Sequence, residues 1–138
     1  MIDTAIGGYL AKAEESTVGA ESELDAGRAD NASSRAYYAA FQAAIAALLA
    51  EGVLVALGKG GTISHKGVNA AFAGQLIHRR KVYSSRMKHT LPWLIELRHR
   101  ADYLPSAVGA GDARASVSMA RDLVEAVVLH VRATEEGK

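Results

Sequence analysis

Apolar residues recur at intervals of three and four along most of the chain, which is the spacing of one face of an α-helix. The first such segment covers residues 2–26 and is followed by Gly27, a residue type that commonly stops a helix. The second is expected to start with Asp30 or Asn31 as its N-cap and to continue to Gly52. The pattern therefore predicts two long amphipathic helices at the start of the chain.

The second of these helices has no charged residue between Arg35 and Glu51. Water has little polar surface to hold in this stretch, which predicts that the helix is central and the most buried one. Its many alanines allow a neighbouring helix to approach closely, either within one chain or across a dimer interface.

A glycine-rich stretch at residues 58–62 predicts a flexible connection, because repeated glycine carries a high entropic cost in an ordered element. The third predicted helix covers about residues 64–78, with Ser64 as its N-cap. A basic link over residues 78–81 follows it.

The fourth predicted helix begins between Ser84 and Thr90 and ends near Asp102. Pro92 fits the first turn of a helix that opens at Thr90, whereas a start at Ser84 requires a kink at the proline. A kinked or broken helix is the preferred interpretation of this segment.

The fifth predicted helix follows a turn at residues 109–111 and has Asp112 as its N-cap. Valine and alanine give it an apolar stripe between Val117 and Val131. We therefore expect one all-α domain of four to five helices over residues 1–138.

Composition supports the helical prediction and excludes several kinds of site. The chain has only 2 prolines and 6% aromatic residues, which favours long helices over strands. It has no cysteine, which excludes disulfides, thiolate metal sites and cysteine nucleophiles. His78 and His89 have no partner ligand at helical spacing, so neither a metal nor a cofactor is expected. No membrane span or secretory signal is recognisable, which predicts a soluble cytoplasmic protein.

Charge is strongly segregated along the chain although the formal net charge is only +1. Residues 1–51 contain eight acidic and three basic residues, whereas residues 52–100 contain nine basic residues and a single acidic one. The basic middle, which includes Arg79 and Arg80, is a candidate surface for the phosphates of RNA. The alternative is a set of solvated helix faces that balance an acidic first helix.

Three short motifs occur in order along this helical pattern. They are Ser34-Arg-Ala-Tyr-Tyr-Ala-Ala-Phe41, His65-Lys-Gly-Val68 and Glu96-Leu-Arg-His-Arg-Ala-Asp-Tyr103. Together they resemble the HEPN superfamily, and most closely its small stand-alone prokaryotic branch. The resemblance extends from about Tyr9 to about Val131.

The resemblance implies an up-and-down helical bundle that usually dimerises around a shared groove and, in active members, cuts RNA without a metal. Those members carry an arginine followed after four to six residues by a histidine. The chemistry suits these residue types, because histidine transfers protons near pH 7 and the planar guanidinium pairs with phosphate oxygens. The arginine that matches the family motif here is Arg98.

The expected histidine is missing from the motif. Tyr103, Leu104 and Pro105 occupy the positions where it should follow Arg98. His99 is adjacent to Arg98, and neighbouring helical residues point about 100° apart, so it cannot take the same place in the groove. The remaining substitutes are Asp102 as a base, Tyr103 as a hydrogen-bond donor, or a histidine from another helix or protomer.

That last substitute is His65, which also stands in the second motif. The residues assigned to catalysis on this basis are Arg98, Asp102 and Tyr103. Those assigned to nucleic-acid contacts are Arg35, Tyr38, His65, Arg79, Arg80, His99 and Arg100. Each group has a structural alternative: an i,i+4 ion pair of Arg98 with Asp102, tyrosines that pack in the core, and a histidine that supports a helix cap.

The leading functional hypothesis is a homodimeric RNA-handling protein of a toxin–antitoxin or defence module, with metal-independent endoribonuclease activity as the enzymatic hypothesis. The family further implies a minimal nucleotidyltransferase as partner, which in some members transfers nucleotides onto a tyrosine near the motif, here Tyr103. The alternatives are a non-catalytic nucleotide-binding or partner subunit, and a purely structural dimer that uses the second helix as its interface.

Overall fold

Five α-helices and two further helical segments make up the computed structural model, which describes residues 2–53 and 64–137. The segments are α1 (Thr4–Asp25), α2 (Ala29–Ala50), α3 (His65–Ala71), η2 (Phe72–Arg79), η3 (Ser85–His89), α4 (Thr90–Tyr103) and α5 (Ala110–Glu136). The described residues contain no strand, which confirms the predicted all-α class. None of the helices in this part of the chain is long and apolar enough to cross a membrane.

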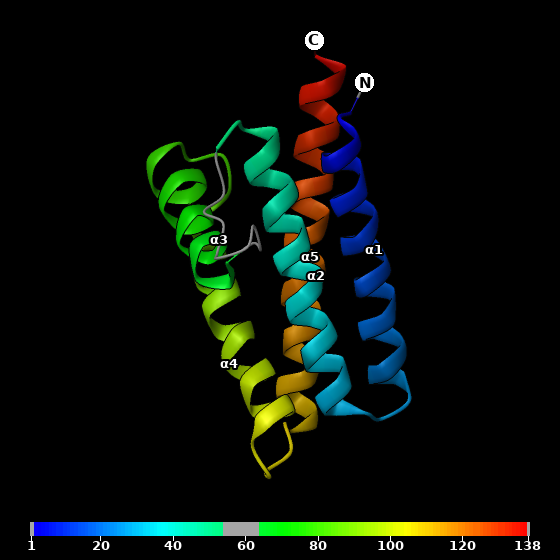
Figure 1. Ribbon diagram of the computed structural model, residues 1–138. Helices are drawn as coiled ribbons and strands as arrows, with labels where there is room; N and C mark the ends of the chain where they lie inside the picture. Colours follow the sequence, from blue (N-terminus) through cyan, green and yellow to red (C-terminus); the bar gives the residue numbers. More distant parts are fainter. Residues whose placement is uncertain (1, 54–63, 138) are drawn as a thin grey trace.

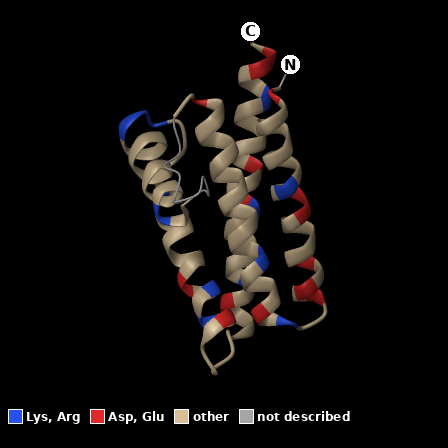
Figure 2. Cartoon of the chain, viewed as in Figure 1, with Lys and Arg blue, Asp and Glu red and all other residues tan. Residues whose placement is uncertain are grey.

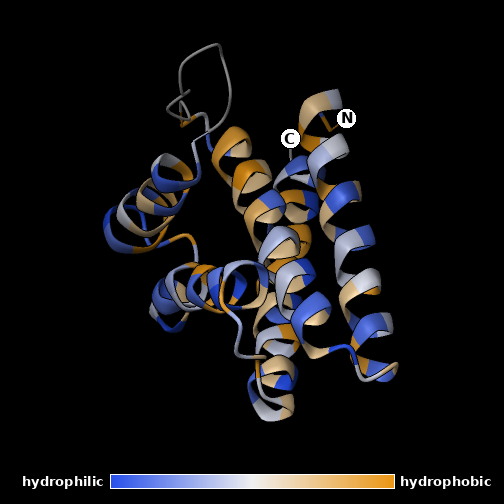
Figure 3. Cartoon of the chain, turned by 60° about the horizontal axis from the view of Figure 1, so that its bottom comes forward, coloured by the Kyte–Doolittle hydropathy of each residue, from blue (hydrophilic) through white to orange (hydrophobic). Residues whose placement is uncertain are grey.

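Helix α2 lies at the centre of the bundle, as its sequence predicts. It packs against α1 and α5 on one side and against α4, α3 and η2 on the other (Figure 1). Hydrophobic residues concentrate in its second half, whereas the surrounding helices mix hydrophobic and hydrophilic residues (Figure 3). Eight of its alanines are completely buried: Ala32, Ala36, Ala39, Ala40, Ala43, Ala44, Ala46 and Ala47.

Burial of these alanines shows that they contact helices of the same chain rather than a second protomer. A methyl side chain lets helix backbones approach closely, and here the close neighbours are the helices of the same chain. The alanine face of α2 is therefore not available as a dimer interface, so the version of the structural hypothesis that used this face is wrong. Any dimer must use another surface.

Helices α1 and α5 lie beside α2 and run antiparallel to each other, and the two ends of the chain lie near each other (Figure 1). Arg121 lies 3.6 Å from Glu21, and Arg132 lies 3.7 Å from Glu14. These ion pairs are largely exposed, so each contributes at most about 1 kcal/mol. Burial of the apolar stripe of α5 is the larger stabilising contribution.

Two of the predicted N-caps are wrong, and in both cases the carboxylate has a tertiary partner instead. Helix α2 begins at Ala29, so Asp30 lies in its first turn, where one oxygen accepts a hydrogen bond of 2.8 Å from the Val108 N–H. Helix α5 begins at Ala110, and Asp112 in its first turn lies 3.9 Å from Arg100. Both carboxylates still favour the positive end of their helix dipole.

The third predicted helix is present, and its predicted cap is confirmed. The Ser64 hydroxyl accepts a hydrogen bond of 3.1 Å from the Gly67 N–H. The helix continues from α3 directly into the π-helix η2, which ends at Arg79, so the first half of the predicted basic link is helical. The predicted connection at residues 58–62 lies outside the described residues.

The segment before α4 is broken rather than kinked. A short 3₁₀-helix, η3, is capped by the Ser84 hydroxyl, and the chain changes to α-helix at Thr90. Pro92 then lies in the first turn of α4, where its missing N–H costs no helical hydrogen bond. The prediction of a broken helix is confirmed, and the break precedes the proline.

Candidate active site

Packing of α4 against α2 places Arg98 beside two consecutive tyrosines. Its Nη1 donates a hydrogen bond of 2.8 Å to the Tyr38 hydroxyl. The guanidinium carbon lies 5.4 Å from the ring centre of Tyr37 and 5.5 Å from that of Tyr38, within the range of cation–π attraction. The Arg98 side chain is only 16% exposed, so these contacts hold the guanidinium in a fixed place at the edge of the core.

The next turn of α4 completes the surroundings of this arginine. Asp102 places a carboxylate oxygen 3.9 Å from Arg98 Nε, which is an ion pair without a direct hydrogen bond. Nε itself is buried and has no hydrogen-bond partner among the described residues. The ring centre of Tyr103 lies 6.0 Å from the guanidinium carbon. Arg98 therefore keeps one buried N–H without a hydrogen-bond partner among the described residues.

His65 approaches the same two tyrosines from a different helix. It is the first residue of α3, and its ring stacks on Phe41, with 4.2 Å between ring centres and 15° between planes. His65 Nδ1 and the Tyr37 hydroxyl are joined by a hydrogen bond of 2.7 Å. The ring also meets the edge of Tyr38, with 6.2 Å between centres. Tyr37 is thus the common neighbour of His65 and Arg98.

The environment of His65 favours its neutral form. Burial lowers the pKa of the imidazole, and the positive charge of Arg98 lowers it further. The effect of Arg98 reflects how near the two side chains lie, since charge interactions weaken with distance. A histidine with a lowered pKa is uncharged at neutral pH and is able to accept a proton.

Tyr37 connects His65 to a third polar residue, Asn69. Burial raises the pKa of Tyr37 to about 12, although hydrogen bonding to the Asn69 side chain and the charge of Arg98 both act to lower it. The hydroxyl therefore stays protonated at neutral pH. The side-chain oxygen of Asn69 is buried and has no hydrogen-bond partner among residues 2–53 and 64–137, so the Asn69 amide N–H is the group that donates to Tyr37. Asn69, Tyr37 and His65 form a continuous polar row inside the bundle.

Five of the residues singled out from sequence come together here. They are Arg98, Asp102, Tyr103, Tyr38 and His65, which we call the Arg98 cluster. Arg35 lies next to it, because a cavity of about 290 Å³ is lined by Arg35 together with Tyr38 and Asp102. The partners Tyr37 and Asn69 were not singled out as site residues. The one sequence signal for Tyr37 is its i,i+4 spacing to Phe41, which places both rings on the same face of the helix.

Arg79 and Arg80 do not belong to this cluster. Arg80 donates a hydrogen bond of 2.9 Å to the carbonyl of Glu51, at the C-terminal end of α2. Glu51 lies thirteen positions after Tyr38, which corresponds to about 20 Å along the helix. Figure 2 shows the basic residues of the middle segment in separate groups, one after η2 and another near the end of α4. Arg79 and Arg80 therefore lie apart from the Arg98 cluster, and their assignment to RNA contacts stays a prediction.

His99 and Arg100 lie beside the cluster on the outer side of α4. Both are exposed, and they line a shallow cavity together with Leu104. The His99 ring centre lies 5.3 Å from that of Tyr103, and Arg100 pairs with Asp112. They are placed to meet a long ligand that extends past Tyr103, but they do not contact Arg98 or His65 through any described hydrogen bond.

The described residues offer no arrangement for a metal ion, since no group of three His, Asp or Glu side chains lies together in them. The chemistry available to the Arg98 cluster is anion binding by a guanidinium and proton transfer by a neutral imidazole. The α4 motif contains the arginine but no histidine, and His65 on α3 supplies the imidazole.

Comparison with known proteins identifies the family. No curated protein sequence matches the chain significantly. The sequence model of the HEPN domain matches residues 7–132, a range that reaches into every helix and includes the whole Arg98 cluster. The chain therefore belongs to the HEPN domain family.

Proposed function

We propose that the protein binds RNA at the Arg98 cluster and cleaves it without a metal ion, with Arg98 binding the phosphate and His65 transferring the proton. HEPN domains have nucleotide- and RNA-related functions, which favours a phosphodiester as the substrate. The observation that carries the proposal is that His65 on α3 and Arg98 on α4 share the neighbours Tyr37 and Tyr38. A histidine from another helix thus stands in for the one missing after Arg98.

The proposed reaction is an internal transfer within the RNA. His65 removes the proton of a ribose 2′-hydroxyl, the 2′-oxygen bonds to the adjacent phosphorus, and the bond to the 5′-oxygen of the next nucleotide breaks. The proton returns to that leaving oxygen, which gives a 2′,3′-cyclic phosphate and a 5′-hydroxyl end. Arg98 stabilises the negative charge that builds on the phosphoryl oxygens through the charge of its guanidinium.

Tyr37 and Asn69 are positioning residues in this proposal. In the tautomer that acts as the base, Nδ1–H of His65 donates to the Tyr37 oxygen, and the Asn69 side chain also hydrogen-bonds to Tyr37. That direction leaves Nε2 of His65 unprotonated and available as the base. Among the described residues Nε2 has no hydrogen-bond partner of its own.

Asp102 and Tyr103 are less suited to be the base. The carboxylate of Asp102 is paired with Arg98 and orients it across one helical turn. Tyr103 is 65% exposed, and its ring centre lies 6.0 Å from the guanidinium carbon of Arg98, at the outer edge of the cluster. We assign Asp102 to orienting Arg98, and Tyr103 to the edge of the RNA-binding surface.

The test is incubation of the purified protein with mixed RNA in the presence of a chelator, followed by analysis of RNA ends. Arg98→Ala and His65→Gln should each abolish the formation of cyclic-phosphate ends. Matched controls are Arg114→Ala and His89→Gln, which change the same residue types at exposed positions on α5 and η3. Cleavage that persists in both site variants at the wild-type rate would remove the catalytic assignment.

A non-catalytic subunit is the second candidate function, and exposure of Tyr103 favours one form of it. Its ring lies at the end of α4 and most of its surface meets solvent, so the hydroxyl is accessible to a modifying enzyme. A nucleotidyltransferase partner would add a nucleotide there. Mass spectrometry after co-expression should show the modification on Tyr103 and none on buried Tyr37, and unmodified Tyr103 would exclude this role.

Dimerisation is also part of the proposal. Tyr103 and Leu104 are large exposed side chains next to the Arg98 cluster, where a second protomer would extend the groove. Light scattering should give the mass of a dimer, and Leu104→Asp should shift it toward the monomer. A monomeric wild-type protein at micromolar concentration would contradict this arrangement.

A further inference from the structure

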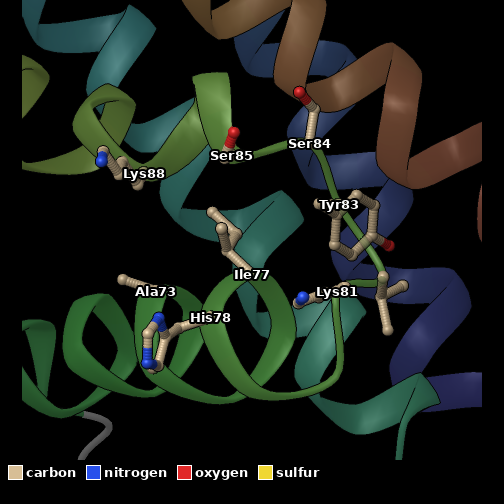
Figure 4. A pocket seen from close by; sticks show the side chains of 10 residues that line it. Ala73, Ile77, His78, Lys81, Tyr83, Ser84, Ser85 and Lys88 are labelled. Carbon is tan, nitrogen blue, oxygen red and sulfur yellow. The ribbon is translucent and has the colours of Figure 1, made fainter.

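A second cavity lies between η2 and η3, remote from the Arg98 cluster. Its volume is about 740 Å³, within the range of small-molecule sites. Figure 4 shows its apolar part, formed by Ile77 and Ala73. His78 near the end of η2 and Lys81 shortly after it lie below, and Ser85 and Lys88 of η3 lie above. It shares no lining residue with the Arg98 cluster, so ligand binding in this cavity does not depend on the proposed RNA cleavage.

The charge around this cavity is uncompensated. Three of its lining residues are basic, His78, Lys81 and Lys88, and no acidic residue is among the described ones that line it. None of the three forms an ion pair with a described side chain. Figure 4 shows the Lys81 ammonium directed into the space beside Ile77. Neighbouring positive charges repel one another, so an anionic ligand is favoured here.

The backbone of Lys81 provides a second, independent observation. Its φ is 54°, in the left-handed region, and it is the one non-glycine residue with positive φ among those described. It directly follows the end of η2, where Arg80 N–H bonds to Gln75 and Val82 N–H bonds to Leu76. Where a helix ends with a left-handed residue, that residue is usually glycine, because glycine has no Cβ to strain. Here a lysine accepts the strain and thereby places its ammonium in the cavity.

The shape of the cavity specifies more than an anion. A phosphate alone would leave most of the volume and the apolar surface of Ile77 and Ala73 uncovered. Gly74 leaves open space where a side chain would stand. We propose that this cavity binds a small ligand in which a phosphate group is joined to a flat or apolar body, with the phosphate on Lys81 and His78 and the body on Ile77.

The probes are AMP, adenosine and a short 5′-phosphorylated oligoribonucleotide, each titrated into the ¹⁵N-labelled full chain. AMP should bind saturably and shift the amide signals of Gly74 and Ser85, and adenosine should bind at least about tenfold more weakly, because it lacks the phosphate. Binding of the oligonucleotide but not AMP would identify an RNA end as the source of the same chemistry. Equal binding of adenosine and AMP, no binding of any probe, or shifts centred on Arg98 would overturn the proposal.

Two variants of Lys81 separate binding from folding. Lys81→Gln should weaken AMP binding by about tenfold or more, whereas Lys12→Gln, the matched change on α1, should leave the affinity within about twofold. Lys81→Gly should lose affinity equally while its Tm is no lower than that of the wild type, because the strain is relieved. Unchanged affinity in both Lys81 variants, or a lower Tm of Lys81→Gly, would contradict the inference.

Discussion

Replacement of Tyr37 by phenylalanine tests the polar row inside the bundle most directly. The change removes a single hydroxyl and keeps the ring, so stacking on Phe41 and packing beside Arg98 remain. What is lost is the 2.7 Å hydrogen bond to His65 Nδ1 and the hydrogen bond that the Asn69 amide donates to the Tyr37 oxygen, so both groups lose this partner.

The expected magnitude follows from the burial of these groups. A buried polar group left without a partner costs about 1–3 kcal/mol, and His65 is only partly buried, which places the loss in the lower half of that range. We expect Tyr37→Phe to lower the free energy of unfolding by about 1–2 kcal/mol. With a urea m-value of about 2 kcal/mol/M for a chain of this size, the midpoint falls by about 0.5–1 M.

The assay is urea unfolding followed by circular dichroism, with Tyr103→Phe as the control. Tyr103 is 65% exposed and should change stability by no more than about 0.5 kcal/mol. In the Tyr37 variant, ¹⁵N NMR of the His65 ring should show a shift toward the other neutral tautomer, and RNA cleavage should fall although Arg98 and His65 are both present. Equal stability of Tyr37→Phe and the wild type would refute the reasoning.

Three further predictions rest on other contacts. The pKa of His65 is lowered in the folded state, so its contribution to the free energy of unfolding is complete above its unfolded pKa of about 6.5 and is lost as pH falls through the folded pKa. His65→Gln should therefore flatten the pH dependence of stability below about pH 6.5, and an unchanged slope would contradict this. Asp30→Ala should cost about 1–2 kcal/mol in urea unfolding, since it leaves the Val108 N–H unpaired, whereas Asp25→Ala at an exposed position should be nearly neutral. Ala43→Leu should cost about 1–3 kcal/mol by overpacking the completely buried face of α2, and a Tm within 1 °C of the wild type, about what measurement error allows, would be inconsistent with that burial.

The helices could be predicted from sequence because their signals are local. Periodic apolar residues, the Ser64 cap and Gly27 act within one or two turns, and the structure has each of them where expected. The caps assigned to Asp30 and Asp112 failed for the opposite reason. A short carboxylate near a helix start can bond to its own backbone or to another segment, and only the packed chain shows which partner is closer.

The candidate site divides in the same way. Arg98 and Asp102 could be paired from their i,i+4 spacing, and the family motif marked the segment. The link between Tyr37, His65 and Asn69 joins α2 to α3, and no spacing along the chain indicates it. Arg79 and Arg80 belong to the same basic stretch of the sequence as Arg98, but Arg80 bonds to Glu51 at the C-terminal end of α2, away from the cluster.

The sequence by itself determined an all-α chain of the HEPN family, with α2 as its buried centre and an arginine but no histidine in the motif of α4. Only the tertiary structure decided that His65 takes a place in the Arg98 cluster and that Lys81 turns its ammonium into a separate cavity. The physical reason is that helix formation depends on neighbours three and four residues away. The surroundings of a charged group depend instead on which helix faces meet once the apolar faces are buried.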